Sequence, residues 1–200
     1  MRSFTVHTGT AVPLRRSNVD TDQIIPGEFC KRIGRTGYAD ALFAEWRDSP
    51  DYILAQPQYL GASVLVAGRD FGIGSSREHA VWALVDHGFR AVIAPSFSDI
   101  FRGNALGNGL LAVQAAQETV ERLWDLVESA PDTPVLVDLE RNAVTAGEIR
   151  FGFTIEEHLR QRLLLGLDEI GNTLRWEEEI ASYEQRRPGW MPRTVPARTS

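Results

Sequence analysis

The segment GRDFGIGSSREHA, residues 68–80, contains the densest group of side chains that could do chemistry. Its glycines, Gly74 among them, allow tight turns and close approach of a ligand to the backbone. Ser75 and Ser76 add hydroxyls, and Arg77 adds a planar guanidinium that matches a carboxylate. A helix that starts directly after the glycines would also offer unpaired N–H groups to an anion. The segment therefore predicts a site for a small anion with serine hydroxyls beside it.

A plainer interpretation of the same residues stays open. The glycines could form a turn, Ser75 could cap the helix with Glu78 in capping-box spacing, and Arg77 could pair with a surface acid. Three better-known templates do not fit. The dinucleotide fingerprint needs a glycine at Arg77, and the Walker pattern needs Gly-Lys-Ser/Thr. The nucleophile elbow needs a glycine two residues after its serine, which neither Ser75 nor Ser76 has.

Three further segments carry polar groups. In NVDTDQIIP, residues 18–26, Asp20 and Asp22 could orient a catalytic group or bind a cation, or could form an ordinary Asx-turn. The basic cluster Lys31, Arg32 and Arg35 could hold a carboxylate from a flexible loop, or could be a solvated face. The polar loop DIFRGNALGN, residues 99–108, follows a predicted strand at the edge of a parallel sheet where ligands usually bind.

The composition excludes several functions. The chain has 200 residues, 43% of them hydrophobic and 24% charged, with a net charge of −6. The negative charge argues against nucleic acid or an anionic membrane as the main partner. The single cysteine, Cys30, can form neither an internal disulfide nor an iron–sulfur site, and no histidine has metal-ligand spacing with it. No apolar run or signal-like N-terminus is present, so we expect a cytoplasmic protein.

The hydrophobic pattern predicts a mixed α/β fold with one main domain over residues 1–186 and a loose tail over residues 187–200. A βαβ unit is predicted from a buried strand at 63–67, a helix at 75–87 ended by Gly88, and a strand at 91–94. The other predicted strands cover residues 4–14 and 110–113, and a hairpin joins 135–139 to 148–153 through 141–147. The other predicted helices cover residues 39–46, 96–101, 118–129, 156–167 and 177–185.

Several of these segments together resemble one family. NVDTDQIIP, FGIGSSREHA and SFSDIFRGNALGNGLL occur in this order in the small subunits of 3-isopropylmalate dehydratase. EFCKRIGRTGYADALFAEWR and IASYEQRRPGWMP resemble the bacterial leucine-pathway members more narrowly. The motif GSSREHA is also shared with the C-terminal domain of aconitase, which implies a swivelling β/β/α domain. The resemblance runs over nearly the whole chain.

The resemblance implies a hydro-lyase that isomerises 2-isopropylmalate and 3-isopropylmalate through isopropylmaleate in leucine biosynthesis. It implies a heterodimer with a large subunit that carries a 4Fe–4S cluster, while the present chain binds no metal. Ser75 corresponds to the family's base, Ser76 and Arg77 to residues that bind the substrate carboxylate, and Asp22 to a supporting residue. We add Gly74 as a supporting residue and Arg35, on the basic loop, as a substrate-binding residue.

One departure from the family pattern and two alternatives remain. Many relatives have an aliphatic residue where this chain has Cys30, which puts in doubt a fixed substrate-selecting pair there. The alternatives are the small subunit of a sister hydro-lyase such as homoaconitase, and a non-catalytic carboxylate-binding module. Restoration of activity by mixing with a large subunit separates an enzyme subunit from a binding module. We also expect residues 27–47 to be mobile until the large subunit binds.

Overall fold

The computed structural model describes residues 1–191, and these residues form two four-stranded sheets. The parallel sheet has the order β2 (Ala11–Leu14), β3 (Val64–Ala67), β4 (Ala91–Ala94) and β5 (Leu111–Gln114). The antiparallel sheet has the order β1 (Val6–Gly9), β6 (Val135–Asp138), β7 (Ala143–Ala146) and β8 (Ile149–Gly152). The strands of the described residues thus form two separate sheets, one parallel and one antiparallel, and not one continuous sheet.

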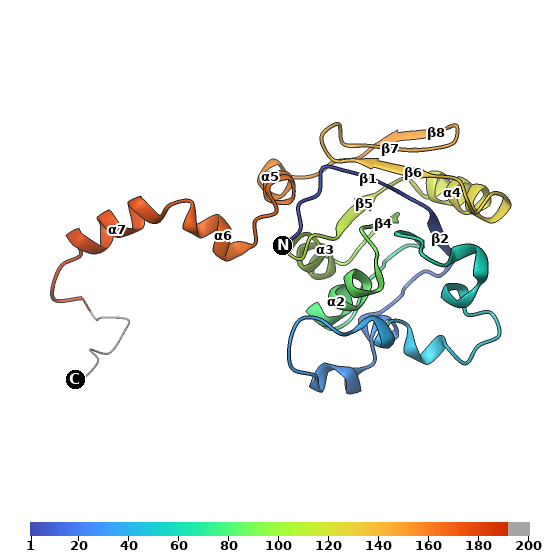
Figure 1. The fold of residues 1–200 in the computed structure, drawn as a ribbon, viewed down its shortest axis with the longest axis horizontal. Helices are drawn as coiled ribbons and strands as arrows, with labels where there is room; N and C mark the ends of the chain where they lie inside the picture. The colour runs from blue at the N-terminus through green and yellow to red at the C-terminus, as the bar shows by residue number, and fades with distance from the viewer. Residues whose placement is uncertain (192–200) are drawn as a thin grey trace.

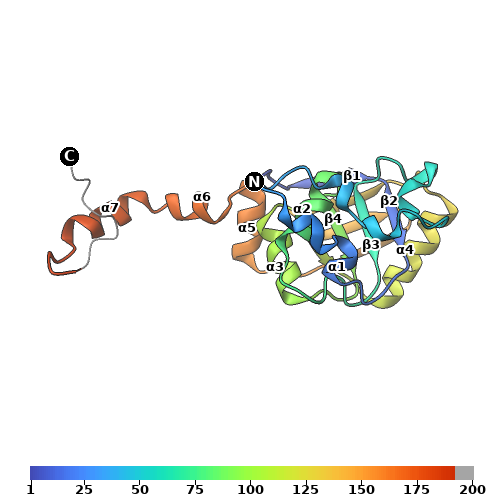
Figure 2. The same ribbon diagram turned by 90° about the horizontal axis from the view of Figure 1, so that it is seen from below.

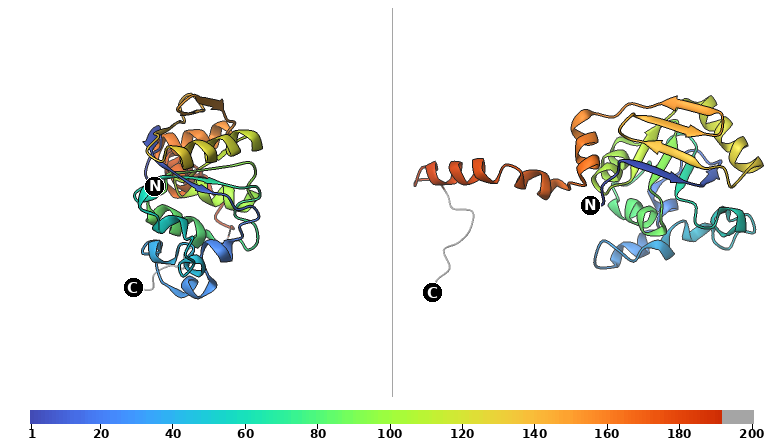
Figure 3. Two further views of the ribbon diagram at one scale, coloured as in Figure 1. Left: turned by 90° about the vertical axis from the view of Figure 1, so that its right-hand side faces the viewer. Right: turned by 45° about the horizontal axis from the view of Figure 1, so that its top comes forward.

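The helices complete three layers, as Figure 1 and Figure 3 show. The antiparallel sheet lies on one side of the parallel sheet, and α2 and α3 cover the opposite side, while α4 packs against β2, β3 and β8. The α-helices are α1 (Thr21–Ile24), α2 (Glu78–His87), α3 (Asp99–Gly107), α4 (Gln117–Ser129), α5 (Glu157–Leu165), α6 (Glu169–Leu174) and α7 (Glu177–Arg186). Short 3-10 helices are η1 (Gly27–Lys31), η2 (Ala39–Ala41), η3 (Ala44–Trp46), η4 (Ile53–Ala55) and η5 (Pro57–Tyr59). The predicted β/β/α domain is confirmed.

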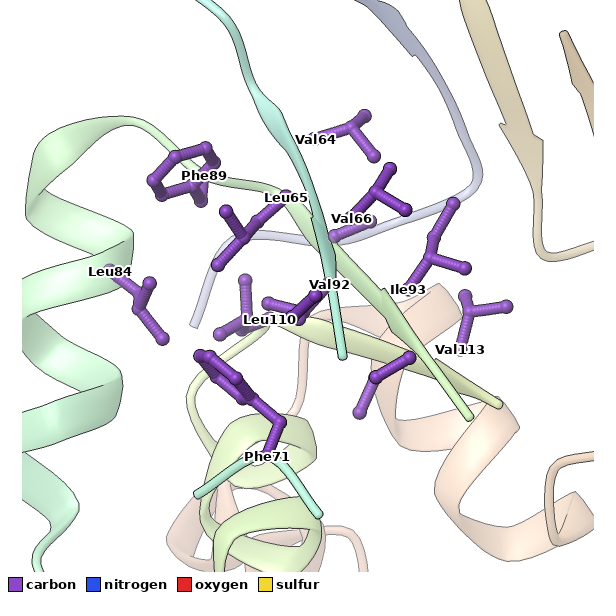
Figure 4. Close-up of a cluster of buried hydrophobic side chains, with 14 of the residues drawn as sticks. Val64, Leu65, Val66, Phe71, Leu84, Phe89, Val92, Ile93, Leu110 and Val113 are labelled. Atoms are coloured by element: carbon purple, nitrogen blue, oxygen red, sulfur yellow. The ribbon is translucent and has the colours of Figure 1, made fainter. Parts of the chain in front are cut away.

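The parallel sheet is buried on both faces, which explains the continuous apolar runs in its sequence. All residues of β2, β3 and β4 are buried. In Figure 4, Leu65 points toward Phe89 and α2, whereas Val64 and Val66 lie on the other side of β3. β3 precedes α2 in the chain and β4 follows it, and the two strands pair in parallel. Gly88 ends α2 in the left-handed conformation. The predicted βαβ unit is therefore confirmed, with its loops available at the carboxyl ends of the strands.

The predicted strand over residues 4–14 is wrong as one element. It forms β1 and β2, which belong to different sheets because β1 pairs with β6 and β2 pairs with β3. The break falls at Thr10, whose carbonyl accepts hydrogen bonds from the N–H groups of both Ser63 and Val64. Alternation alone could not locate this break because both halves are extended.

Two other predictions are also wrong in detail. The 141–147 connection of the predicted hairpin contains a strand of its own, β7, which pairs with both β6 and β8. The segment predicted as a loop after residue 101 is helical, because Ser98 caps α3 and the helix continues to Gly107. The segment was predicted as a polar loop, yet Phe101, Ala105 and Leu106 form a buried face that favours the helix.

The segment 27–47 divides into an exposed part and an anchored part. Residues 31–37 are exposed, but Tyr38, Leu42 and Phe43 have no exposed surface. The hydroxyl of Tyr38 donates to the carbonyl oxygens of Arg32 and Gly34 and closes the loop at its base. The mobility prediction therefore remains for residues 27–37, and the predicted helical patch at 39–46 is two short 3-10 turns.

The last helices extend away from the layered body, as Figure 2 and Figure 3 show. Neither α6 nor α7 contains a buried residue. The packed layers accordingly end near α5, and the domain boundary at residue 186 stays a prediction. Residues 192–200 of the predicted tail lie outside the described part of the chain. None of the described helices is long and apolar enough to cross a membrane.

Candidate active site

The glycine-rich segment connects the end of β3 to the start of α2 and is held from both sides. Short parallel bridges join Ile73 to Asp20 and Phe71 to Phe97. Gly72 and Gly74 have positive φ angles of 76° and 91°. Residues other than glycine rarely adopt this backbone conformation. A Cβ on Gly72 would lie 2.3 Å from Cγ of Phe101 on α3. The glycines therefore allow the loop both to turn and to lie against α3.

Ser75 and Ser76 lie at the exposed crest of this loop, ahead of the helix. The predicted capping box between Ser75 and Glu78 is wrong. Arg77 is the N-cap of α2 with an extended backbone, φ −101° and ψ 106°, so no helical turn can begin at Ser75. Glu78 instead accepts a hydrogen bond of 2.7 Å from the side-chain amide of Asn108. Within residues 1–191, neither serine hydroxyl has a hydrogen-bond partner, so both remain available to a ligand.

The backbone of Ser75 is fixed even though its side chain is not. Its carbonyl oxygen accepts hydrogen bonds from Thr21 Oγ1 at 3.0 Å and from the N–H of Arg77 at 2.8 Å. The N–H of Thr21 donates to the carbonyl oxygen of Ile73 at 2.9 Å. Two groups of a single threonine thus hold the two residues on either side of Gly74.

The motif NVDTDQIIP forms the single turn α1 that carries this threonine. Asp20 caps the turn: it accepts a hydrogen bond of 2.7 Å from the N–H of Gln23, whose side chain accepts one of 3.0 Å from the N–H of Asp20. Asp20 therefore has a structural task, in line with the plainer interpretation of an Asx-type turn. Asp22, two residues later, faces the glycine-rich loop instead and contacts Arg77.

Arg77 and Asp22 form an ion pair at the edge of the site. The pair joins Nη1 of Arg77 to Oδ1 of Asp22, with side chains 26% and 53% exposed. The hydrogen bond to Asp22 raises the pKa of Arg77 above its ordinary value, although a guanidinium is positively charged at neutral pH even without this bond. Gly27 lies beside both groups, since a Cβ there would be 3.7 Å from Nη1 and 3.8 Å from Oδ1. The exposed loop thus begins directly beside the predicted carboxylate-binding residue.

Arg35 lies elsewhere in this structure. Its guanidinium is 5.9 Å from the ring centroid of Trp82, and it lines a hollow of about 410 Å³ together with Glu78, Asn108 and Asp168. Within residues 1–191 no hydrogen bond or ion pair joins Arg35 to residues 74–77. Its role in substrate binding stays a prediction that requires the loop to move.

The neighbouring Arg32 of the basic cluster has a structural partner. Its guanidinium donates to Asp40 at 2.6 Å and 2.7 Å and to the carbonyl oxygen of Gly37 at 2.7 Å. These bonds hold the exposed loop closed on itself. Arg32 is therefore committed to the loop, and the structure favours its plainer interpretation over a ligand-binding one.

Sequence reasoning missed two groups that support the site. Thr21 was passed over although it stands inside the motif that supplied Asp20 and Asp22. Asn108 joins α3 to α2 through two hydrogen bonds. Its side-chain amide donates to Glu78, and its side-chain oxygen accepts a hydrogen bond of 3.1 Å from the indole N–H of Trp82. Asn108 lay in the polar segment 99–108 that the sequence had indicated, but no local pattern revealed its partners.

The part of the chain that the structure describes holds no group of three or more His, Cys, Asp or Glu residues that could bind a metal. Cys30, which is partly buried, is its one cysteine. Three thiolates or an equivalent donor set are needed to hold an iron–sulfur cluster. The residues present do not fit such a cluster.

The two-sheet β/β/α fold and the Gly-Ser-Ser-Arg loop before its first long helix indicate a protein of the aconitase superfamily. The model of the aconitase C-terminal domain matches residues 1–118. The model of the C-terminal domain of 3-isopropylmalate dehydratase small subunits matches residues 169–197. The chain belongs to the family of 3-isopropylmalate dehydratase small subunits, within the aconitase superfamily.

Individual relatives agree with this assignment. The chain is 59% identical to a 3-isopropylmalate dehydratase small subunit of Acidothermus cellulolyticus, over 97% of this chain and 98% of the relative. It is 58% identical to the small subunit of Micrococcus luteus over 100% of both chains. The crystal structure of a 3-isopropylmalate dehydratase from Methanocaldococcus jannaschii superposes with a TM-score of 0.65 at 27% identity, covering 90% of this chain and 99% of that one.

Proposed function

We propose that this chain is the small subunit of a cytoplasmic hydro-lyase that isomerises 2-isopropylmalate and 3-isopropylmalate through isopropylmaleate in leucine biosynthesis. We further propose that it is active only as a heterodimer with a large subunit. The single observation that carries the proposal is the exposed pair of serine hydroxyls, without partners in residues 1–191, beside the guanidinium of Arg77. This arrangement provides a proton acceptor and an anion-binding group at one open surface.

Ser75 is the proposed base that moves the proton. In dehydration its deprotonated Oγ, an alkoxide, accepts the proton from the carbon next to the one that loses the hydroxyl and becomes a neutral hydroxyl. In hydration that hydroxyl returns the proton to carbon and becomes the alkoxide again. The negative charge of the alkoxide must be stabilised before the proton is taken. Because α2 begins at Glu78 and not at Ser75, the positive end of the helix is more distant than the sequence predicted. We therefore propose that Arg77 contributes to stabilising this charge.

Ser76 and Arg77 are the proposed groups for a substrate carboxylate. The bond to Asp22 uses one nitrogen of the guanidinium, and a guanidinium has five N–H donors. Asp22 can thus orient Arg77 while the remaining donors face a carboxylate. Arg35 would add a second positive charge if the exposed loop 27–37 closes over the bound dicarboxylate.

The large subunit is proposed to hold a 4Fe–4S cluster. When bound there, the cluster would supply the Lewis acid that accepts the substrate hydroxyl, a function that serine and arginine cannot perform. The present chain contributes proton transfer and carboxylate binding only.

Exposed apolar side chains support assembly with a partner. They lie on α5 to α7 and the connections between them: Leu165, Ile170, Leu174, Trp176, Ile180 and Tyr183 are 39% to 70% exposed. Large apolar side chains exposed in such number along one stretch of chain are typical of protein–protein interaction sites. The open crest at Ser75 and Ser76 likewise lacks the walls that would exclude water from a reaction.

The test is reconstitution with a cluster-loaded large subunit and measurement of 2-isopropylmalate conversion. Ser75→Ala should lower kcat by about 10²–10⁴-fold with KM nearly unchanged, because Arg77 and Ser76 still bind the carboxylate. The matched control is Ser3→Ala, an exposed serine at the N-terminus, which should retain wild-type turnover. An assembled Ser75→Ala enzyme with wild-type kcat would show that the loop only binds a carboxylate and supplies no base.

A further inference from the structure

We propose that Thr21 is a positioning residue for Ser75 and that the buried hydroxyl of Thr21 acts through the backbone of Ser75. The hydroxyl bonds to the carbonyl of Ser75 and thereby aims the serine side chain at bound substrate. This inference rests on the proposed function, because it concerns the orientation of the proposed base. Thr21 itself touches no reacting atom and is therefore not a catalytic residue.

The burial of Thr21 is the first observation. Among residues 1–191, the buried polar or charged side chains are Thr21, 2% exposed, and Asp138, 7% exposed. Asp138 accepts a hydrogen bond of 2.9 Å from the N–H of Arg141 in the turn after β6. The hydroxyl of Thr21 has its one proton committed to the carbonyl of Ser75. A valine would fill the same space, so the hydroxyl contributes this contact and little else.

The second observation is the position of the two Thr21 bonds around Gly74. The N–H of Thr21 holds Ile73 and its hydroxyl holds Ser75, so the bonds bracket a glycine with φ 91°. Glycine has the widest conformational freedom of any residue and would otherwise act as a hinge. Locking both sides of this hinge fixes the direction in which Ser75 leaves the backbone.

The third observation is that the guanidinium of Arg77 is held by a different route, through Asp22. Only the backbone N–H of Arg77 shares the Ser75 carbonyl with Thr21. Loss of the Thr21 hydroxyl should therefore disturb Ser75 more than the carboxylate-binding guanidinium. This predicts an effect on kcat that is separate from the effect on KM.

The experiment compares Thr21→Val, which keeps the shape and loses the hydroxyl, with Thr21→Ser, which keeps the hydroxyl. In the reconstituted heterodimer, Thr21→Val should lower kcat by about 10–100-fold, since small misplacement of a reacting group has costs of this order. Its KM should stay within about 3-fold of wild type, because Asp22 still orients Arg77. Thr21→Ser should recover kcat to within about 3-fold of wild type. Thr145→Val, in strand β7, is the matched control and should leave kcat unchanged.

A second measurement needs no activity. Amide exchange in the free subunit, followed by NMR, should become about 10-fold faster at the N–H of Arg77 in Thr21→Val, because its acceptor is the Ser75 carbonyl. Thr21→Ser should keep the slow exchange. If Thr21→Val fails to fold, Thr21→Ala against Thr21→Ser makes the same comparison.

The outcomes separate this inference from the proposed function. Wild-type kcat and wild-type exchange in Thr21→Val overturn the positioning role, as does a Thr21→Ser variant that is as slow as Thr21→Val. If Ser75→Ala is fully active, the proposed function fails instead, and the aiming of a base fails with it, whereas the exchange result still reports whether the hydroxyl fixes the loop. Loss of kcat in both Ser75→Ala and Thr21→Val, with rescue by Thr21→Ser, supports both.

Discussion

Substitution of Gly72 by alanine tests whether α3 holds the glycine-rich loop in place. The added Cβ would lie 2.3 Å, 2.5 Å and 2.6 Å from Cγ, Cδ2 and Cβ of Phe101. Rotation of the ring cannot remove the contact with Cβ, which is attached to the α3 backbone. The ring itself is confined by an edge-to-face contact with Phe71 at 5.2 Å and a stacked contact with Phe97 at 6.1 Å. Either the loop or the helix must therefore shift.

The magnitude follows from two costs. A side chain in the left-handed conformation costs about 1–2 kcal/mol, and Gly72 has φ 76°. Overpacking of a well-filled core costs about 1–3 kcal/mol. Gly72→Ala should therefore lower the free energy of unfolding by about 2–5 kcal/mol, a large part of the roughly 5–15 kcal/mol of a typical domain.

Urea unfolding of the free subunit measures this loss, with Gly88→Ala as the matched control. Gly88 has φ 116° but no heavy atom within 4 Å of its ideal Cβ, so that variant carries the backbone cost alone. We expect Gly72→Ala to lose about 1–3 kcal/mol more than Gly88→Ala, and the reconstituted enzyme to lose kcat because Ser75 follows three residues later. Equal losses in the two variants would refute the contact with Phe101, and wild-type kcat in Gly72→Ala would refute its connection to Ser75.

Three further predictions follow from the charges and the loop. Arg77→Lys keeps the charge but loses the planar fork, so steady-state kinetics should show KM raised and kcat lowered; an unchanged KM would contradict the carboxylate role. Amide exchange of residues 31–37 should be fast in the free subunit and slow in the heterodimer, and equal protection in both would contradict loop closure. Burial, followed by repulsion from Arg90 and Arg2, lowers the pKa of His7 below 6.5. Between pH 6.5 and that lowered pKa the unfolded chain binds more protons than the folded one, so the free energy of unfolding should fall on acidification. His7→Gln should reduce this dependence in urea titrations at pH 7 and pH 5.5, and an identical pH dependence would contradict it.

The main elements of the sheet were predictable because their sequence signal is local. A parallel strand buried on both faces requires an apolar run, and β3 and β4 show one. Gly88 predicted the end of α2 because a left-handed residue there favours glycine. The hypothesis of an anion site at residues 74–77 also rests on a local signal, since it depends on residue types that stand next to one another, and it stays a prediction.

The start of α2 was not predictable, because a local preference competed with a contact from a distant part of the chain. Ser75 and Glu78 have the spacing of a capping box, but Glu78 is held by Asn108, 30 residues further along the chain. The division of residues 4–14 between two sheets depended on partners still more remote in sequence. Local propensity is weak compared with such contacts, and the tertiary structure decided both cases.

By itself, the sequence determined which groups can perform chemistry: two adjacent serines, an arginine and a flexible glycine loop, in a chain with too few cysteines for a cluster. Only the tertiary structure decided what holds them in place. Thr21 lies 54 residues from Ser75, and Asp22 lies 55 residues from Arg77. A hydrogen bond depends on distance and direction in space, and the fold alone brings such separated residues within reach of each other.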